Sequence, residues 1–222
     1  MKNKDIIKNH IKNGVIFRCL DGVYIGPQAG IESGVEIYQN NIITGKSVIK
    51  KGAVIGKGNT ITDSVVGESC VITDSVITGS VIGAGVTVGP FAHIRPGSVI
   101  GGNCRIGDFV EIKNSSIGDG TKVSHLTYIG DSDLGSGINI GCGVVFVNYD
   151  GKEKHRSEVG DGAFIGCNVN IISPAKIGAG AYLAAGSTVA GEVPAGALFI
   201  ERGEGEIKEG WVERRGLLKK EK

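Results

Sequence analysis

Three groups of residues carry side chains that could do chemistry on a charged substrate. Arg95 and Lys113 each directly follow an aliphatic residue and stand eighteen positions apart. His125 lies in a His-Leu-Thr-Tyr segment that ends at Tyr128, and histidine is the side chain that most often serves as a general base. A polar stretch over residues 148–156 interrupts an otherwise regular pattern. These groups are candidates for an anion site and for a base, although a lone histidine is more often a structural residue.

A repeat of six residues must position these side chains. Aliphatic residues recur mostly at every sixth position, beginning with Ile25, Ile31, Ile37, Ile43, Ile49, Ile55 and Ile61, and after short slips the series continues to Val189. A small residue often stands two positions earlier, so both point to one face of a short strand. Frequent Gly, Asn and Asp supply a turn in each repeat. Hexads of this kind are typical of a parallel β-helix, in which three hexads make one triangular coil.

The coil places Arg95 directly above Lys113. Their separation of eighteen residues is one full coil, and adjacent coils stack at about 4.8 Å. Two like charges at that distance are unfavourable unless an anion lies between them, and a phosphate suits an arginine beside a lysine. The alternative is a splayed, hydrated pair on the surface.

The unbroken repeat predicts one domain with two appendages. Residues 1–14 are expected to form a leader or short helix, residues 15–200 a β-helix of about nine coils with an inserted loop at 147–158, and residues 201–222 a charged arm, either a solvated tail or a segment that packs on a neighbouring subunit. A net charge of +1 indicates no attraction to nucleic acid, and no apolar run is long enough to span a bilayer. A cytoplasmic protein with reduced thiols is therefore expected.

Several motifs resemble one family of hexapeptide acyltransferases. They are residues 89–97 (GPFAHIRPG), 109–113 (FVEIK), 124–131 (SHLTYIGD), 139–143 (NIGCG), 148–151 (NYDG) and 184–187 (AAGS). In this order they resemble the acetyltransferase domain of the bifunctional enzymes that make UDP-N-acetylglucosamine, a peptidoglycan precursor. The resemblance spans about residues 15–215, and it implies an all-β, left-handed parallel β-helix, a homotrimer and active sites between subunits.

The resemblance also assigns roles to individual residues. It implies that His125 is the general base in the transfer of acetyl from acetyl-CoA to the amino group of glucosamine 1-phosphate, without an acyl-enzyme or a metal. The residues that it implies for the sugar phosphate are Arg95, Lys113, Tyr128, Asn139 and Lys154. Those that it implies for acetyl-CoA are Cys142, Asn148, Tyr149, Cys167, Ala185 and Arg202.

Physical reasoning adds two groups to this reaction. Glu111 is the carboxylate predicted to orient the imidazole and to stabilise its cation. The oxyanion needs donors, for which the candidates are backbone N–H groups near Cys142 and the side chain of Asn148. A nucleophilic thiol at Cys142 or Cys167 is the alternative to this direct transfer, although neither has the neighbours of an activated cysteine.

Other functions remain open at this stage. The short leader leaves no room for a nucleotidyltransferase domain, so uridylyl transfer is not expected from this chain. The acceptor could be another amino sugar or a nucleotide-linked sugar. A γ-class carbonic anhydrase needs three histidines around zinc, and no others are placed to join His125. The alternative outside the enzymes is a β-helix scaffold that binds a sugar nucleotide without turnover.

Overall fold

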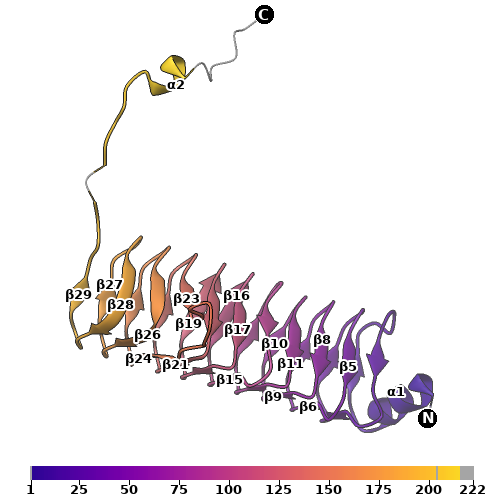
Figure 1. The fold of residues 1–222 in the computed structure, drawn as a ribbon. Coiled ribbons are helices and arrows are strands. Elements are labelled where there is room, and N and C mark those ends of the chain that lie inside the picture. The colour runs from indigo at the N-terminus through magenta and orange to yellow at the C-terminus, as the bar shows by residue number, and fades with distance from the viewer. Residues whose placement is uncertain (1, 204, 216–222) are drawn as a thin grey trace, which may run out of the picture.

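The computed structural model describes residues 2–203 and 205–215. Its body is a stack of triangular coils, shown in Figure 1, with helix α1 (Asn3–Lys12) at the N-terminal end. Each coil contributes one short strand to each of three faces, and every named strand pair is parallel, from the β1–β4 pair to the β27–β29 pair. The β-helix predicted from the repeat is confirmed as a nearly all-β parallel solenoid, an architecture consistent with the left-handed winding that the resemblance implies.

We call the three faces A, B and C. Face A is an 11-stranded sheet. Its strands are β1 (Ile16–Phe17), β4 (Glu36–Ile37), β7 (Val54–Ile55), β10 (Val71–Ile72), β13 (Thr87–Val88), β16 (Arg105–Asp108), β19 (Lys122–His125), β22 (Asn139–Ile140), β25 (Phe164–Ile165), β27 (Tyr182–Leu183) and β29 (Leu198–Phe199). Eleven rungs enclose about ten turns, one more than the hexad count predicted.

Faces B and C are joined into one sheet by two long strands near the C-terminal end of the stack. Face B comprises β2 (Tyr24–Ile25), β5 (Ile42–Thr44), β8 (Thr60–Thr62), β11 (Val76–Thr78), β14 (His93–Ile94), β17 (Glu111–Lys113), β20 (Tyr128–Gly130) and β23 (Val145–Val147). Face C comprises β3 (Gly30–Ile31), β6 (Val48–Ile49), β9 (Val65–Val66), β12 (Val81–Ile82), β15 (Val99–Ile100), β18 (Ser116–Ile117), β21 (Ser132–Leu134) and β24 (Ser157–Val159). Strands β26 (Asn170–Ile177) and β28 (Thr188–Val193) continue through both faces.

The aliphatic residues of the repeat form a single core along the axis of the solenoid. Ile37, Ile55 and Ile94 are fully buried, like most of the series, because the alternation within each strand turns them inward. A few buried corners are polar instead. There Asn59 donates from its side chain to the side-chain oxygen of Asn41 over 3.0 Å, so the amide groups of adjacent coils satisfy one another.

The two ends of the chain differ from the coils. The helix predicted within residues 1–14 is present as α1, and its Ile6 and Ile7 pack on the first coil. After β29, Figure 1 shows the segment with the short helix α2 (Trp211–Arg214) leading away from the stack. The predicted arm at 201–222 lies partly outside the described residues. No helix in the described part of the chain is long and apolar enough to cross a membrane.

Candidate active site

His125 ends strand β19 at the corner between faces A and B, and its imidazole is paired with a carboxylate. Its Nδ1 lies 2.6 Å from Oδ1 of Asp108, which occupies the same register position one coil earlier. The hydrogen bond from His125 is the main reason that the pKa of Asp108 is lowered. Both side chains are partly exposed, so the ring is positioned and still accessible to a substrate.

The structure does not bring Glu111 to His125, contrary to the predicted contact. Glu111 is on face B, in register with His93 and Tyr128, whereas His125 belongs to a strand of face A. The carboxylate of Glu111 accepts a hydrogen bond from Nη1 of Arg95 over 2.7 Å. Asp108 therefore holds the position beside the imidazole, and Glu111 neutralises part of the charge in the neighbouring cation cluster.

Three cationic side chains predicted to bind the sugar phosphate meet on face B. Strands β14 and β17 pair in the register that stacks Arg95 on Lys113, as the spacing predicted. Lys154, from the inserted loop, contacts Lys113. That contact is the main cause of a lowered pKa at Lys113, with desolvation next and the charges of Lys154 and Arg95 adding to it. We call Arg95, Lys113 and Lys154 the cation cluster.

A buried carboxylate, that of Asp131, lies close to the cation cluster. Asp131 is 7% exposed and accepts hydrogen bonds from the side-chain amides of Asn114 and Asn148. Those two hydrogen bonds and the nearby charges of Lys113 and Lys154 outweigh desolvation, the largest single effect, and the pKa of Asp131 is lowered. The carboxylate is thus ionised at neutral pH and offsets the repulsion between the two lysines.

Tyr128 lies beside Asn148 because Gly130 leaves room for both. A Cβ atom built on Gly130 would stand 2.4 Å from the hydroxyl oxygen of Tyr128 and 2.6 Å from Nδ2 of Asn148. Glycine in a strand commonly marks such a close approach. The predicted residues Tyr128, Asn148, Lys113, Lys154 and Arg95 therefore belong to one continuous surface of face B.

The inserted loop is ordered by its own polar side chains. Oδ1 of Asp150 accepts hydrogen bonds from the backbone N–H groups of Lys152 and Glu153 over 2.8 and 2.7 Å. Tyr149 and Lys154 form an antiparallel bridge, and the hydroxyl of Tyr149 donates to the carbonyl of Gly151. This tight turn carries Lys154 back over face B.

Three of the residues predicted to contact acetyl-CoA form a column that begins at His125. Pairing of β19 with β22, β22 with β25, and β25 with β27 places Cys142, Cys167 and Ala185 after successive strands of face A. The backbone N–H of Asn168 donates to the carbonyl of Cys142, and that of Gly186 to the carbonyl of Cys167. The column follows the corner from the base toward the C-terminal end of the solenoid.

The remaining predicted residues lie apart from this corner within one chain. Asn139 is on face A, in register with Lys122 and Phe164, and therefore faces away from the cation cluster. Arg202 is exposed and follows the last rung. A single chain does not surround a substrate with all the predicted side chains.

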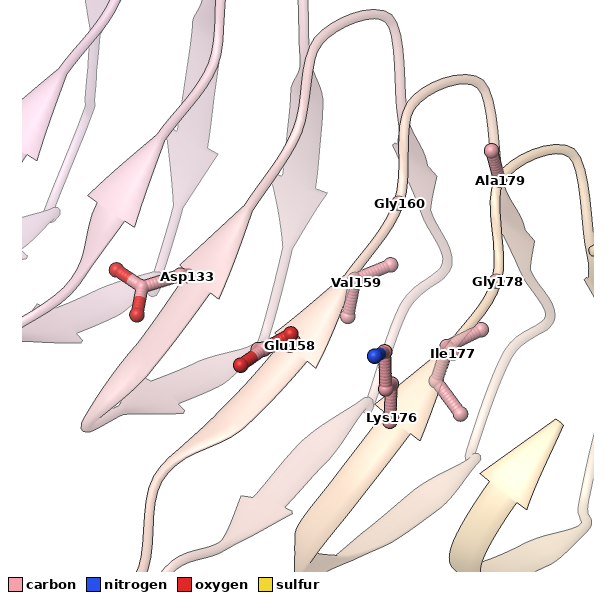
Figure 2. A pocket seen from close by; sticks show the side chains of 8 residues that line it. All are labelled: Asp133, Glu158, Val159, Gly160, Lys176, Ile177, Gly178 and Ala179. Atoms are coloured by element: carbon pink, nitrogen blue, oxygen red, sulfur yellow. The ribbon is translucent and has the colours of Figure 1, made fainter.

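Two further features of the surface lie outside the candidate site. A pocket of about 320 Å³ on face C is lined by Asp133 of β21, Glu158 of β24 and Lys176 of β26 (Figure 2), none of which is a predicted site residue. Among the described residues, no group of three His, Cys, Asp or Glu side chains is placed to hold a metal ion.

Sequence reasoning missed three residues of this site, namely Asp108, Asp131 and Gly130. Asp108 precedes His125 by seventeen residues, which is a coil shortened by one of the slips in the repeat. Counting back one coil from His125 identifies Asp108 only when the five-residue step between Ile112 and Ile117 is allowed for. Asp131 and Gly130 carry no such signal, because their roles depend on the contacts of Asn148.

Comparison with known proteins agrees with the repeat and the site motifs. The family described as bacterial transferase hexapeptide (six repeats) matches residues 79–114 and 156–191. The bifunctional protein GlmU of Clostridium acetobutylicum is 52% identical over 216 residues, which cover 97% of this chain and 47% of that protein. GlmU of Caldanaerobacter subterraneus is 50% identical over 210 residues, covering 95% of this chain and 46% of that protein.

The chain spans about half the length of these relatives. Among solved structures, the match to LpxA from Acinetobacter baumannii covers 76% of this chain and 69% of the LpxA chain, at 17% identity. Its TM-score of 0.41 is too low to support conclusions about this site. The chain is therefore similar to the hexapeptide transferase family over two segments and, over nearly its whole length, to one part of the bifunctional protein GlmU.

Proposed function

We propose that this protein is an N-acetyltransferase that moves acetyl from acetyl-CoA to the 2-amino group of glucosamine 1-phosphate. The observation that supports it most is the position of His125, which lies at the corner between the cation cluster on face B and the column formed by Cys142, Cys167 and Ala185. A phosphorylated sugar on the cluster and a thioester along the column would meet at the imidazole.

The reaction needs one proton acceptor and no covalent intermediate. The sugar amine attacks the thioester carbonyl as Nε2 of His125 accepts the amine proton. The tetrahedral intermediate then collapses, the C–S bond breaks, and the proton passes to the sulfur of the departing CoA. The side chain of Asn148 already donates to Asp131, so we place the oxyanion donors among backbone N–H groups near Cys142.

We further propose that the active protein is a homotrimer with sites between subunits. The predicted residues of one chain divide between faces A and B, with Asn139 on the opposite side of the corner from the cation cluster. An apolar ridge runs along that same corner, formed by Phe91, Phe109 and Leu126, each more than half exposed. A second copy that covers the ridge would bring its own side chains to the site.

Two alternatives are separated by a thiol-release assay. Acetyl-CoA is supplied with glucosamine 1-phosphate, glucosamine 6-phosphate or UDP-linked amino sugars, and free CoA is measured. We expect release with glucosamine 1-phosphate. Preference for a nucleotide-linked sugar would replace the acceptor, whereas no release with any acceptor would favour a β-helix that binds a sugar nucleotide without turnover.

The role of His125 is tested by His125→Ala in the same assay. Removal of a general base typically costs 10²- to 10⁴-fold in rate, so we expect kcat to fall by about that factor with KM for both substrates nearly unchanged. A variant that retains native kcat would remove His125 from the mechanism. His93→Ala is the matched control, because it removes the imidazole of another histidine. His93 lies on face B, one coil before Glu111.

A further inference from the structure

The strands that carry Asp108 and His125 are longer than their neighbours. In face A, β16 and β19 have four residues each, whereas the other described strands of this sheet have two. The extra residues continue the pairing beyond Ile106 and Val123 until Asp108 lies in register with His125. The backbone is therefore extended at the one corner where the candidate base stands.

Gly107 permits this extension. A Cβ atom built on Gly107 would lie 2.0 Å from the carbonyl oxygen of Ser124, a distance that no side chain tolerates. Its φ is not in the left-handed region, so this glycine is not required by a turn. It is required by the close approach of the two strands, which brings Asp108 and His125 side by side.

The resulting pair contributes little to the stability of the fold. Both side chains are partly exposed, with Nδ1 of His125 and Oδ1 of Asp108 2.6 Å apart, and an ion pair that water can reach contributes little to stability. Its chemical effect is larger. A carboxylate accepts a hydrogen bond only from a protonated Nδ1, so the neutral ring keeps its free lone pair on Nε2.

We propose that Asp108 is the positioning residue for His125, fixing the tautomer and the orientation of the ring and facing the imidazolium when it forms. This inference rests on the proposed function. When the amine attacks the thioester, its proton moves to Nε2, and the positive ring lies against the carboxylate of Asp108. The proton then leaves from Nε2 to the CoA sulfur, and Asp108 gains none. Glu111, bonded to Arg95, is not in this position.

The tautomer is measured by ¹⁵N NMR of the histidine ring in the full chain, which needs no activity. In the native protein we expect His125 to carry its neutral-form proton on Nδ1. Asp108→Ala should move the proton to Nε2, the form that free imidazole side chains prefer in water. Asp108→Asn retains the side-chain volume but can donate its amide N–H to Nδ1, so it should likewise move the ring proton to Nε2. A native tautomer in Asp108→Ala would overturn the proposal.

Kinetics provide the second readout. We expect Asp108→Ala to lower kcat at least tenfold with KM for both substrates within about twofold, because the contact acts on the base and not on binding. Unchanged kcat would also overturn the proposal. Glu36→Gln is the matched control, since Glu36 is a carboxylate of face A paired with Arg18 over 2.9 Å and remote from the site. If the native protein transfers no acetyl group, the proposed function fails, while the ring measurement still decides whether Asp108 fixes the tautomer.

Discussion

Lys113 holds its position in the cation cluster at an electrostatic cost. Lys154 contacts it from the inserted loop and Arg95 stacks on it from the preceding coil, and both lower the pKa of Lys113. The charge of Asp131 acts against this effect at Lys113, while Glu111 is bonded to Arg95. A phosphate dianion would relieve the remaining repulsion, which supports the proposed binding of a sugar phosphate at the cation cluster.

Removal of one member of the cluster should weaken binding of the phosphorylated substrate and leave the chemical step intact. We expect Lys154→Met to raise KM for the sugar phosphate about tenfold, the loss of one charge-assisted hydrogen bond, with kcat and KM for acetyl-CoA within about twofold. Steady-state kinetics with each substrate varied in turn provide the measurement. Lys152→Met, in the same loop, should leave all three values native. A fall in kcat alone would place Lys154 in the chemical step instead.

Single residues of the site were predictable where the repeat is regular. Arg95 and Lys113 are eighteen residues apart, and their stacking follows from counting alone. Between Asp108 and His125 the coil is one residue shorter, and the count fails unless the slip is allowed for. Glu111 was predicted as the partner of His125 because the two lie within one coil of each other in the sequence. Glu111 is on face B, however, whereas His125 ends a strand of face A, and the corner separates the two side chains.

The inserted loop is attached to the body of the solenoid at its end as well as at its start. Arg156 donates from Nε and Nη2 to the two carboxylate oxygens of Asp133 and from Nη1 to the carbonyl of Asn114 over 2.9 Å. These bonds are the main reason that the pKa of Asp133 is lowered to about 2. The loop that carries Lys154 is therefore anchored to face C.

This anchor should be sensitive to acid. The pKa of Asp133 falls from 3.8 to about 2 on folding, so the pair stabilises the folded state above about pH 4, and this contribution is lost as the pH falls from about 4 to 2. Arg156→Gln should lower stability by up to about 1 kcal/mol at pH 7, because the pair is half-exposed. Urea unfolding at pH 7, 4 and 2 should show that difference shrinking. Lys46→Gln is the control, because Lys46 is an exposed residue. If its difference in unfolding free energy from the native protein shrank with pH in the same way, the assignment to Asp133 would be contradicted.

The elements of the fold were predictable to different degrees. The coils followed from the hexads, because each aliphatic residue must be buried and each strand alternates. The long strands β26 and β28 did not, since there the chain passes from face B to face C without the usual turn, with a register shift between Ile172 and Ala175. The path of the inserted loop depends on the hydrogen bonds of Asp150 and Arg156. The residue spacing in the sequence does not predict the partners of these two side chains.

At the level of the assembly, the apolar ridge combines two unfavourable features in one chain. Phe91, Phe109 and Leu126 have φ of 59°, 56° and 46°, a region that side chains avoid, and each is more than half exposed. The rings of Phe91 and Phe109 stack with centroids 5.4 Å apart. Burial of the ridge by another subunit would offset both costs, which supports the proposed trimer.

Phe109→Gly separates these two effects. Glycine tolerates the left-handed conformation, which costs other residues about 1 to 2 kcal/mol. The thermal stability of the monomer should therefore not fall. The trimer should lose apolar contact area, and its dissociation concentration should rise at least tenfold. Analytical ultracentrifugation over a dilution series measures the mass. Val99→Thr, an exposed residue of face C, should leave the mass unchanged. A native dissociation constant for Phe109→Gly would place the subunit interface elsewhere.

The parallel stacking of the coils makes the length of this molecule independent of its chemistry. Each strand pairs only with those of the coils directly above and below, and all the candidate site residues lie from Arg95 onward. The earlier coils therefore act as a rigid spacer in which each added or deleted coil changes the reach by about 4.8 Å. The distance between helix α1 and the corner that carries His125 can therefore be changed, by evolution or by design, in steps of one coil.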